Sequence, residues 1–173
     1  MILNRELKYN GYLKIEELTI TTPSGKEITR EVLVKQNAVA ALVYNTVTGK
    51  YIFARQWRPG PESDILEIPA GVRDKSGETP EQCIIREIEE EAGYSTDRLQ
   101  FITEGYVSPG GTTEMISIWF AEVSQKINQG GGVETEDEEI EIVELTRQEM
   151  LSTTFKDFKT IIAVQWAKYN QGI

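Results

Sequence analysis

Hydrophobic and polar residues alternate along the first part of the chain in a pattern typical of extended strands. The segments 11–20, "GYLKIEELTI", and 26–35, "KEITREVLVK", flank the turn sequence "TPSG", whose proline and glycine favour a tight reversal. Two apolar runs, at 38–45 and 50–57, follow on either side of "TVTG". The pattern predicts an N-terminal antiparallel β arm and then a second, more buried pair of strands.

A helix is predicted from Thr79 to Ala92. Thr79 is suited to the N-cap, the proline after it occupies the first helical position, and Gln82 can close a capping box. Gly93 is the matching C-terminal stop.

Further strands surround this helix, and two helices end the chain. A short strand in "DILEIPAG", 64–71, is ended by Pro69 and Gly71. Other strands are predicted at 99–107, 115–123 and 139–146, and helices at 146–152 and 158–171. The last helix carries an apolar stripe broken by one polar position, formed by Ile161, Ile162, Val164, Gln165 and Ala167. These elements predict an α+β fold with a large mixed sheet, divided into a β arm over 1–38 and a main domain over 39–173.

Composition limits the class of protein. The chain has 173 residues, of which 39% are hydrophobic, enough to bury a core. It contains no apolar run of about eighteen residues, and its start, "MILNRELKYNG", lacks a signal core, so we expect neither membrane insertion nor secretion but a cytoplasmic protein. The single cysteine, Cys83, lies on an apolar helix face and is predicted to be a core residue.

Charge limits the chemistry. A formal net charge of −10 argues against a groove for nucleic acid, because phosphate backbones require a basic surface. The chain has no histidine, which excludes Ser-His-Asp and Cys-His catalysis and histidine-ligated zinc. Carboxylates remain for acid-base work, and oxygen ligands favour hard ions such as Mg²⁺ or Mn²⁺.

The predicted helix crowds glutamates onto its second half. On a helical wheel, Glu87 and Glu91 lie together along one margin of the core face, with Glu90 one step further round and Glu89 on the far margin. The core face is assigned to Ile84, Ile85, Ile88 and Ala92. Like charges four residues apart destabilise a helix, and although Arg86 can pair with Glu78 or Glu90, one guanidinium does not neutralise four carboxylates. The pattern therefore favours a bound divalent cation; the alternative is a solvated acidic helix without a metal.

The same residues resemble a known signature. The spacing Gly71-x6-Glu78-x7-Arg86-Glu87-Ile88-x-Glu90-Glu91-x-Gly93-Tyr94 is similar to the Nudix box, found in hydrolases that cleave nucleoside diphosphates linked to another moiety. Only the first gap differs, by one residue more than the family usually has. That residue lies in a loop, where an insertion costs little. The resemblance implies the Nudix fold, a mixed sheet sandwiched between helices in α/β/α layers.

The resemblance also implies a metal site. Glu87 and Glu91 would be ligands, with Glu90 acting directly or through water, and the backbone carbonyl of Ala70 would complete the inner shell. The implied cofactor is Mg²⁺, with Mn²⁺ as a possible substitute.

Four further positions of the box have implied structural roles. Glu78 would orient Arg86 and brace the loop, while Gly71 and Gly93 mark the two ends of the motif.

A catalytic base is expected in "GGGVETEDEEIEIVEL", 130–145. Without histidine, the base should be a carboxylate on a mobile segment, and the three glycines are interpreted as giving this loop freedom to swing. Resemblance to ADP-ribose pyrophosphatases of the family implies a loop glutamate as the base, with Glu138 the nearest positional match, then Glu139; Glu136 is also present. Glu90 is a further catalytic candidate. The alternative is a solvated acidic loop without a role.

Two segments are similar to the substrate-binding parts of the same subfamily. In "RQWRPGPESDILEIPAG", the resemblance implies that Arg58 contacts a substrate phosphate, and Arg55 and Trp57 are further substrate candidates. In "YVSPGGTTEMISIWFAE", Pro109 stands at the position of a subfamily marker. The residues there with a predicted role toward sugar or phosphate are Gly110, Gly111 and Glu114.

The implied reaction is the Mg²⁺-dependent hydrolysis of a nucleoside diphosphate sugar, with ADP-ribose split into AMP and ribose 5-phosphate. GDP-mannose is the alternative substrate. A ligand sensor without turnover and a triphosphate or RNA-cap hydrolase are further alternatives. Subfamily members are typically homodimers in which arm strands cross to the partner, and Tyr9, Tyr12 and Trp57 are candidates for stacking on the base.

Overall fold

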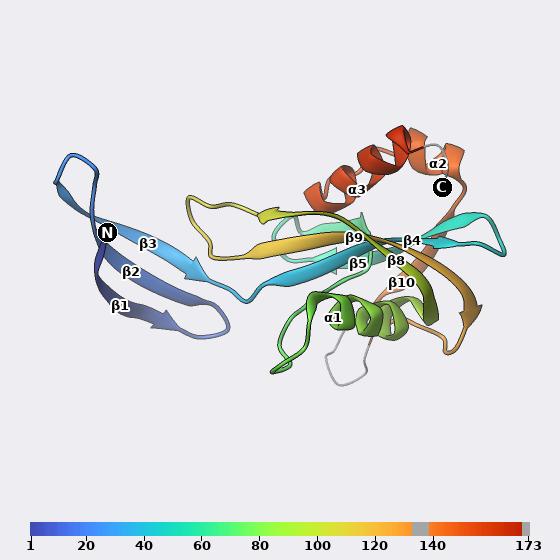
Figure 1. Ribbon diagram of the computed structural model, residues 1–173, viewed down its shortest axis with the longest axis horizontal. Coiled ribbons are helices and arrows are strands. Elements are labelled where there is room, and N and C mark those ends of the chain that lie inside the picture. The colour runs from blue at the N-terminus through green and yellow to red at the C-terminus, as the bar shows by residue number, and fades with distance from the viewer. Residues whose placement is uncertain (133–138, 171–173) are drawn as a thin grey trace. The chain divides into compact units, whose positions relative to one another are not determined.

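The structure is a computed structural model that describes residues 1–132 and 139–170. Strands are more extensive than helices, and the helices come after the seventh strand and at the C-terminal end (Figure 1). In chain order the elements are β1 (Ile2–Asn10), β2 (Lys14–Thr21), β3 (Glu27–Val34), β4 (Ala38–Asn45), β5 (Lys50–Arg58), β6 (Ser63–Glu67), β7 (Ala70–Val72), α1 (Pro80–Glu87), the π-helical turn η1 (Ile88–Ala92), β8 (Tyr94–Tyr106), β9 (Met115–Lys126), β10 (Glu141–Leu145), α2 (Arg147–Ser152) and α3 (Phe158–Tyr169).

The chain divides into two compact units. The first consists of Met1–Ala38 and Glu104–Ile116, and the second of Val39–Thr103 and Ser117–Ile173. The sequence pattern did not indicate that 104–116 joins the N-terminal strands. The predicted division into a β arm over 1–38 and a main domain over 39–173 stays a prediction.

The first unit is built on an antiparallel sheet in the order β1-β2-β3. Every residue of β1 is exposed, and the sequence pattern had not singled this strand out. The end of β3 is tied to the loop after β8, because the Leu33 N–H donates to the Gly111 carbonyl at 2.9 Å and the Thr113 N–H donates to the Leu33 carbonyl at 3.1 Å.

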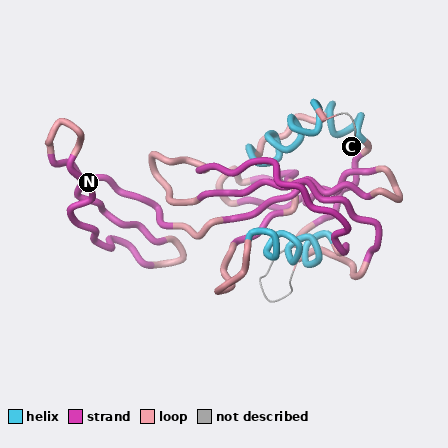
Figure 2. Tube along the Cα trace, in the orientation of Figure 1, coloured by secondary structure: helices cyan, strands magenta, loops and turns pink. Residues whose placement is uncertain are grey.

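The second unit contains a mixed sheet of seven strands. Its order is β10-β5-β4-β9-β8, with β6 paired to β5 and β7 paired to β4. The turn η1 and helix α1 lie on one face of this sheet, and α2 and α3 lie on the other (Figures 1 and 2). Ile84 and Ile88 on the first face pack with Val39 and Ile52 of the central strands in one buried cluster. The predicted α/β/α layering is therefore confirmed.

Helix α1 starts as the sequence predicts but does not stay α-helical. The Thr79 hydroxyl accepts from the Gln82 N–H at 3.2 Å, and the Gln82 side chain accepts from the Thr79 N–H at 3.0 Å. Gly93 ends the helical segment with a left-handed φ of 80°. The last turn is a π-helix, in which the Gly93 N–H donates to the Ile88 carbonyl at 3.1 Å. The uniform wheel was therefore wrong for this turn, which is wider than an α-helical one.

Three predicted details of packing are wrong. Ile85 is 36% exposed, because Ile84 and Ile88 already fill the core side of α1. Gly71 lies inside β7 and does not end a strand. In α3 the buried face is formed by Thr160, Ala163, Val164 and Ala167, and Ile162 is exposed. These four residues are three or four positions apart and therefore share one face of the helix. Thr160, a polar residue, lies on this buried face, whereas Ile162 does not.

Within the residues that the structure describes, no helix combines the length and apolar character needed to cross a bilayer.

Candidate active site

The glutamates of the box differ in burial. Glu87 and Glu91 are only 8% and 7% exposed, because Ile88 and Ala92 beside them are fully inside the core. Glu89 and Glu90 are half-buried. Two carboxylates are thus held at the edge of the apolar core, an environment that is costly for a charge without a partner.

Arg86 is the positive partner at the centre of this cluster. Its Nε and Nη2 donate to the two Glu78 oxygens at 3.0 and 3.2 Å, and its Nη1 lies 2.7 Å from a Glu90 oxygen and 2.7 Å from a Glu87 oxygen. Both predicted pairs, with Glu78 and with Glu90, are therefore present. The hydrogen bonds with Glu78 raise the pKa of Arg86 and lower the pKa of the Glu78 carboxyl, so both groups stay ionised. Asp74 also lies 3.7 Å from Nη2 of Arg86, so this guanidinium faces four carboxylates. Lys75 lies 4.0 Å from Glu90, and the cluster still keeps an excess of negative charge.

The helix carboxylates lie directly against the backbone of β7. A Cβ added to Gly71 would lie 1.9 Å from Cδ of Glu87, so only glycine leaves room for that carboxylate. One residue earlier, the Ala70 N–H donates to Oε2 of Glu91 at 3.0 Å. The packing of β7 on the helix thus brings the Ala70 backbone next to the two buried glutamates.

This donor set fits a hard divalent cation. Its atoms are carboxylate and carbonyl oxygens, they lie at a partly buried edge, and they carry more negative charge than Arg86 offsets. Among the described residues, no three acidic side chains already converge on one point, since Glu87 and Glu90 turn toward Arg86. The ligand roles of Ala70, Glu87, Glu90 and Glu91 stay predictions.

Cys83 is a core residue, as predicted. It is fully buried, and burial raises the pKa of its thiol to about 12, with the hydrogen bond to Glu78 acting in the same direction. The thiol is therefore protonated at neutral pH and is not a nucleophile.

The glycines after β9 fasten their loop to the end of η1. The Gly131 N–H donates to the Glu91 carbonyl at 2.7 Å, and the Gly132 N–H donates to the Glu90 carbonyl at 3.3 Å. A Cβ on Gly130 would lie 2.5 Å from the Glu91 carbonyl oxygen. From the sequence, these glycines are expected to give the loop freedom to swing. In the described part of the loop they adopt positive φ angles, and they let the loop backbone approach the end of η1 closely enough to donate hydrogen bonds to its last carbonyls.

A pocket of about 460 Å³ opens beside this loop. Its lining residues come from β5, β6, the glycine loop and the start of β10: Arg55, Trp57, Asp64, Gly131, Glu139, Ile140 and Glu141. The pocket brings together three predicted site residues, Arg55, Trp57 and Glu139. It also adjoins the end of η1, because Gly131 both lines it and binds the Glu91 carbonyl. Glu138 and Glu136, the other acids considered for the base, lie outside the described residues.

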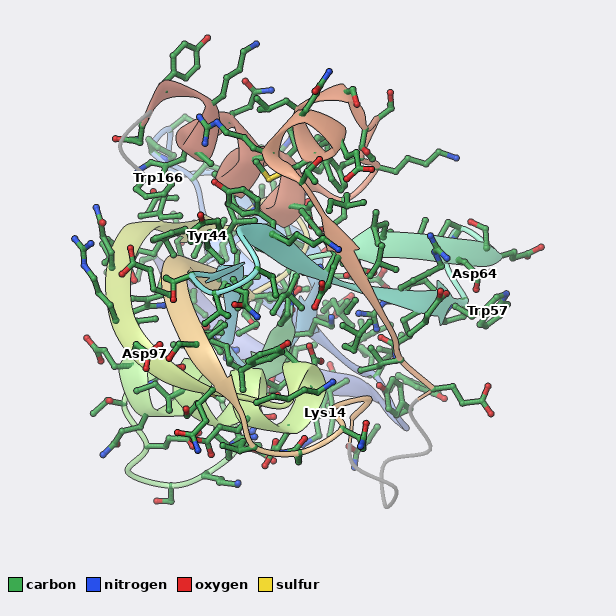
Figure 3. All side chains as sticks on the ribbon, turned by 90° about the vertical axis from the view of Figure 1, so that its right-hand side faces the viewer. Lys14, Tyr44, Trp57, Asp64, Asp97 and Trp166 are labelled. Carbon is green, nitrogen blue, oxygen red and sulfur yellow. The ribbon has the colours of Figure 1, made fainter. Side chains whose placement is uncertain are left out.

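Asp64 was not anticipated as a pocket residue. It is paired directly with Trp57 across β5 and β6, and the two side chains lie next to each other (Figure 3). The hairpin between 58 and 63 was the signal that could have found it, because residues opposite each other on paired strands face the same side. On β10, Glu141 pairs with Arg55 and accepts from its Nη1 at 2.8 Å.

Arg58 is engaged with Glu67. Its Nε and Nη2 donate to the two oxygens of this buried carboxylate at 2.8 and 3.2 Å, and Lys159 also pairs with it. Burial alone would raise the pKa of the Glu67 carboxyl, but the hydrogen bond from Arg58 and the charge of Lys159 hold it below its ordinary value. Contact between Arg58 and a substrate phosphate stays a prediction.

The second predicted substrate segment lies in the first unit. Glu114 pairs with Lys35 at 3.4 Å, and a Cβ on Gly110 or Gly111 would meet nothing within 4 Å. No close backbone approach therefore requires glycine at these two positions in the structure. The roles of Gly110, Gly111 and Glu114 toward a substrate stay predictions.

Known proteins agree with this fold and motif. Residues 34–164 match the model of the NUDIX domain family. The chain is 36% identical over 165 residues to the ADP-ribose pyrophosphatase of Bacillus subtilis, covering 93% of this chain and 86% of that protein. It is 35% identical over an alignment of 182 residues to the GDP-mannose pyrophosphatase of Yersinia enterocolitica, covering 96% and 93%. A solved structure described as an ADP compounds hydrolase superposes with a TM-score of 0.79 at 22% identity, covering 99% of this chain and 95% of that one, and supports the fold.

The chain belongs to the Nudix family. Family membership and the pyrophosphatases among its relatives make it a hydrolase.

Replacement of the buried carboxylate by an amide, Glu67→Gln, should lower the free energy of unfolding by about 2 kcal/mol near pH 7, because Arg58 and Lys159 lose their ionised partner. Since the pKa of Glu67 is lowered in the folded state, its stabilising contribution is present above its ordinary pKa of 4.5 and is lost as pH falls through the folded-state value. Urea unfolding from pH 7 down to pH 3 should therefore show the two proteins converging in acid.

The matched control is Glu122→Gln, which breaks the exposed pair of Glu122 with Arg98 and should change stability by less than about 0.5 kcal/mol. A difference between wild type and Glu67→Gln that stays constant down to pH 3 would contradict the assignment.

Proposed function

We propose that this protein hydrolyses the diphosphate of a nucleoside diphosphate sugar in the presence of Mg²⁺, with ADP-ribose split into AMP and ribose 5-phosphate. The observation that carries the proposal is the pocket holding Arg55, Trp57 and Glu139, which adjoins the end of the turn that bears Glu91. The name of the Bacillus subtilis relative, an ADP-ribose pyrophosphatase, supports the same substrate.

The pocket residues suit the two ends of such a substrate. Trp57 is 57% exposed, so its ring offers a flat apolar surface for a nucleobase. Arg55 supplies a positive charge for a phosphate, although Glu141 offsets part of it. Glu139 is the second candidate, after Glu138, for the carboxylate that would accept a proton from the attacking water. The proposed substrate contacts of Arg58, Gly110, Gly111 and Glu114 would add to these.

A metal ion is needed because the acidic cluster would repel a diphosphate. We propose that Glu87 and Glu91 hold Mg²⁺ or Mn²⁺ together with the Ala70 carbonyl, and that Glu90 contributes directly or through water. When bound, such an ion would neutralise phosphate charge and polarise the phosphorus centre. Gly71 leaves room for the Glu87 carboxylate, and Arg86 with Glu78 would keep the neighbouring acids apart and oriented.

GDP-mannose is the second candidate substrate. The Yersinia enterocolitica relative, a GDP-mannose pyrophosphatase, covers slightly more of the chain at nearly equal identity. Asp64 beside Trp57 adds a carboxylate acceptor, which would suit adjacent N–H donors on a guanine edge. A nucleotide-sugar sensor without turnover is the less favoured reading, because all the acids of the box are present.

We further propose that the protein works as a cytoplasmic homodimer, with the arm over 1–38 as the dimerisation element. The support is the exposure of β1, whose residues Ile2, Leu7 and Tyr9 are each more than half exposed. A three-stranded sheet whose edge strand exposes apolar side chains is unfavourable in a monomer, because such an edge tends to pair with another chain.

A substrate panel tests the proposed reaction. Purified protein with Mg²⁺ is given ADP-ribose, GDP-mannose, other nucleoside diphosphate sugars, dinucleotides and nucleoside triphosphates, and products are separated by ion-exchange chromatography. We expect the highest kcat/KM with ADP-ribose, and GDP-mannose next. A preference for triphosphates would exclude the proposal.

Glu91 and Glu89 lie on opposite margins of the core face of the box helix, so replacing each by glutamine gives a matched pair of variants. Glu91→Gln should lower kcat by about a hundredfold or more and weaken Mn²⁺ binding, because it removes a charged ligand and keeps the shape. Glu89→Gln removes the same charge from the same turn and should retain kcat within about twofold. Steady-state kinetics and Mn²⁺ titration followed by electron paramagnetic resonance measure both; equal losses in the two variants would overturn the ligand assignment.

The base assignment has its own comparison. Glu138→Gln should lower kcat much more than it raises KM, because a base acts in the chemical step and not in binding. Glu139→Gln is the control one residue further on. If Glu139→Gln shows that pattern and Glu138→Gln does not, the role belongs to the residue that lines the pocket.

A further inference from the structure

Thr160 is a buried polar residue that belongs to no motif of the family signature. None of its surface is exposed, and its hydroxyl makes two hydrogen bonds. It accepts from the Ile68 N–H at 2.9 Å and donates to Oδ2 of Asp157 at 2.6 Å. The direction of both bonds is fixed, because an amide N–H only donates and an ionised carboxylate only accepts.

Lys159, the residue before Thr160, lies in the same turn of α3. Lys159 pairs with the buried carboxylate of Glu67 and lies 3.1 Å from Oδ1 of Asp157. Asp157 is the N-cap of α3 and accepts from the Thr160 N–H at 3.0 Å. The first turn of α3 thus binds both the side chain of Glu67, through Lys159, and the backbone N–H of Ile68, through Thr160.

The peptide group between Pro69 and Ala70 is held on both sides. The Pro69 carbonyl accepts from the Ala41 N–H of β4 at 2.9 Å, and the Ala70 N–H donates to Glu91 at 3.0 Å. These two groups belong to one planar peptide unit, so its orientation is set by β4 and by the helix together. The φ angle of Pro69 is restricted by its ring. Little freedom remains for the carbonyl of Ala70, the following group along the chain.

We infer that Thr160 is a positioning residue for the proposed reaction, because its hydroxyl fixes the segment 68–70 and thereby aims the Ala70 carbonyl and the amide that binds Glu91. The inference rests on the proposed metal-dependent hydrolysis, in which Ala70 and Glu91 are ligands. It adds a residue from the opposite face of the sheet to a site otherwise built from β7 and the box helix (Figure 1).

The test compares Thr160→Val with Thr160→Ser in the full chain. Valine keeps the size and the backbone N–H that caps α3 but removes the hydroxyl; serine keeps the hydroxyl. Thr160→Val should lower kcat for ADP-ribose by about tenfold, since small misplacements of positioned groups are costly in rate, with KM nearly unchanged. Thr160→Ser should restore kcat to within about twofold of wild type.

Two readouts do not depend on turnover. In Thr160→Val, Mn²⁺ affinity should fall by about fivefold or more by electron paramagnetic resonance, because a carbonyl ligand is misdirected. Amide hydrogen exchange at Ile68 and Ala70, followed by NMR, should become faster in the valine variant and return toward wild type in the serine variant.

Thr146→Val is the matched control. Thr146 caps α2 with a similar hydroxyl-to-carboxylate bond, to Glu149, and within the described residues it makes no hydrogen bond to 67–71. The loss of its hydroxyl should therefore lower stability and leave kcat and Mn²⁺ affinity unchanged. All variants are assayed below their unfolding midpoints. If Thr160→Val does not fold, Lys159→Gln replaces it, with the same expected direction for kcat and Mn²⁺ affinity.

The inference is overturned if the folded variant at 159 or 160 keeps both kcat and Mn²⁺ affinity at the level of Thr146→Val. If wild type itself hydrolyses none of the nucleoside diphosphate sugars, the proposed function fails, and the positioning role falls with it. Loss in the variants with an active wild type supports both.

Discussion

The site depends on the close packing of two glutamates against the backbone of a three-residue strand. Glu91 accepts from the Ala70 N–H, and Glu87 occupies the space that any side chain on Gly71 would fill. Both glutamates are buried, and burial of charge is unfavourable without compensation. Ile88 and Ala92, the residues that follow Glu87 and Glu91 in the chain, fix the helix to the core and so hold both glutamates at its edge.

The rest of the second unit supports this contact from both sides of the sheet. The glycine loop caps the carbonyls at the end of η1 and carries one wall of the pocket there. From the other face, α3 holds Glu67 and Ile68 just before β7. The charges of the site also favour a cation. Arg86 pairs with Glu78, Glu87 and Glu90, but the cluster stays negative, so it attracts a cation more readily than an anionic ligand alone.

The sequence predicted much of this arrangement because its signals are local. The capping box at Thr79, the stop at Gly93 and the position of Glu87 and Glu91 together beside the core face follow from spacing along one helix. The π-helical turn did not follow, since it arises from the hydrogen bond between Gly93 and Ile88 that a regular wheel does not contain. Ile85 was assigned to the core from its place on a regular helical wheel and Ile162 from the apolar stripe of the last helix, but neighbours at better angles already filled the core. Thr160, Asp64 and the anchoring role of Gly130 and Gly131 come from contacts between segments far apart in the chain, and a single sequence carries little information on such contacts.

The proposed reaction requires that buried glutamates on the box helix hold a divalent ion when substrate is present. Isothermal titration calorimetry of Mg²⁺ into the full chain, saturated with a nonhydrolysable ADP-ribose analogue, tests it most directly. We expect clear uptake of Mg²⁺ by the wild-type complex, measured as heat of binding. Absence of any Mg²⁺ or Mn²⁺ uptake by the folded, analogue-bound protein would contradict it.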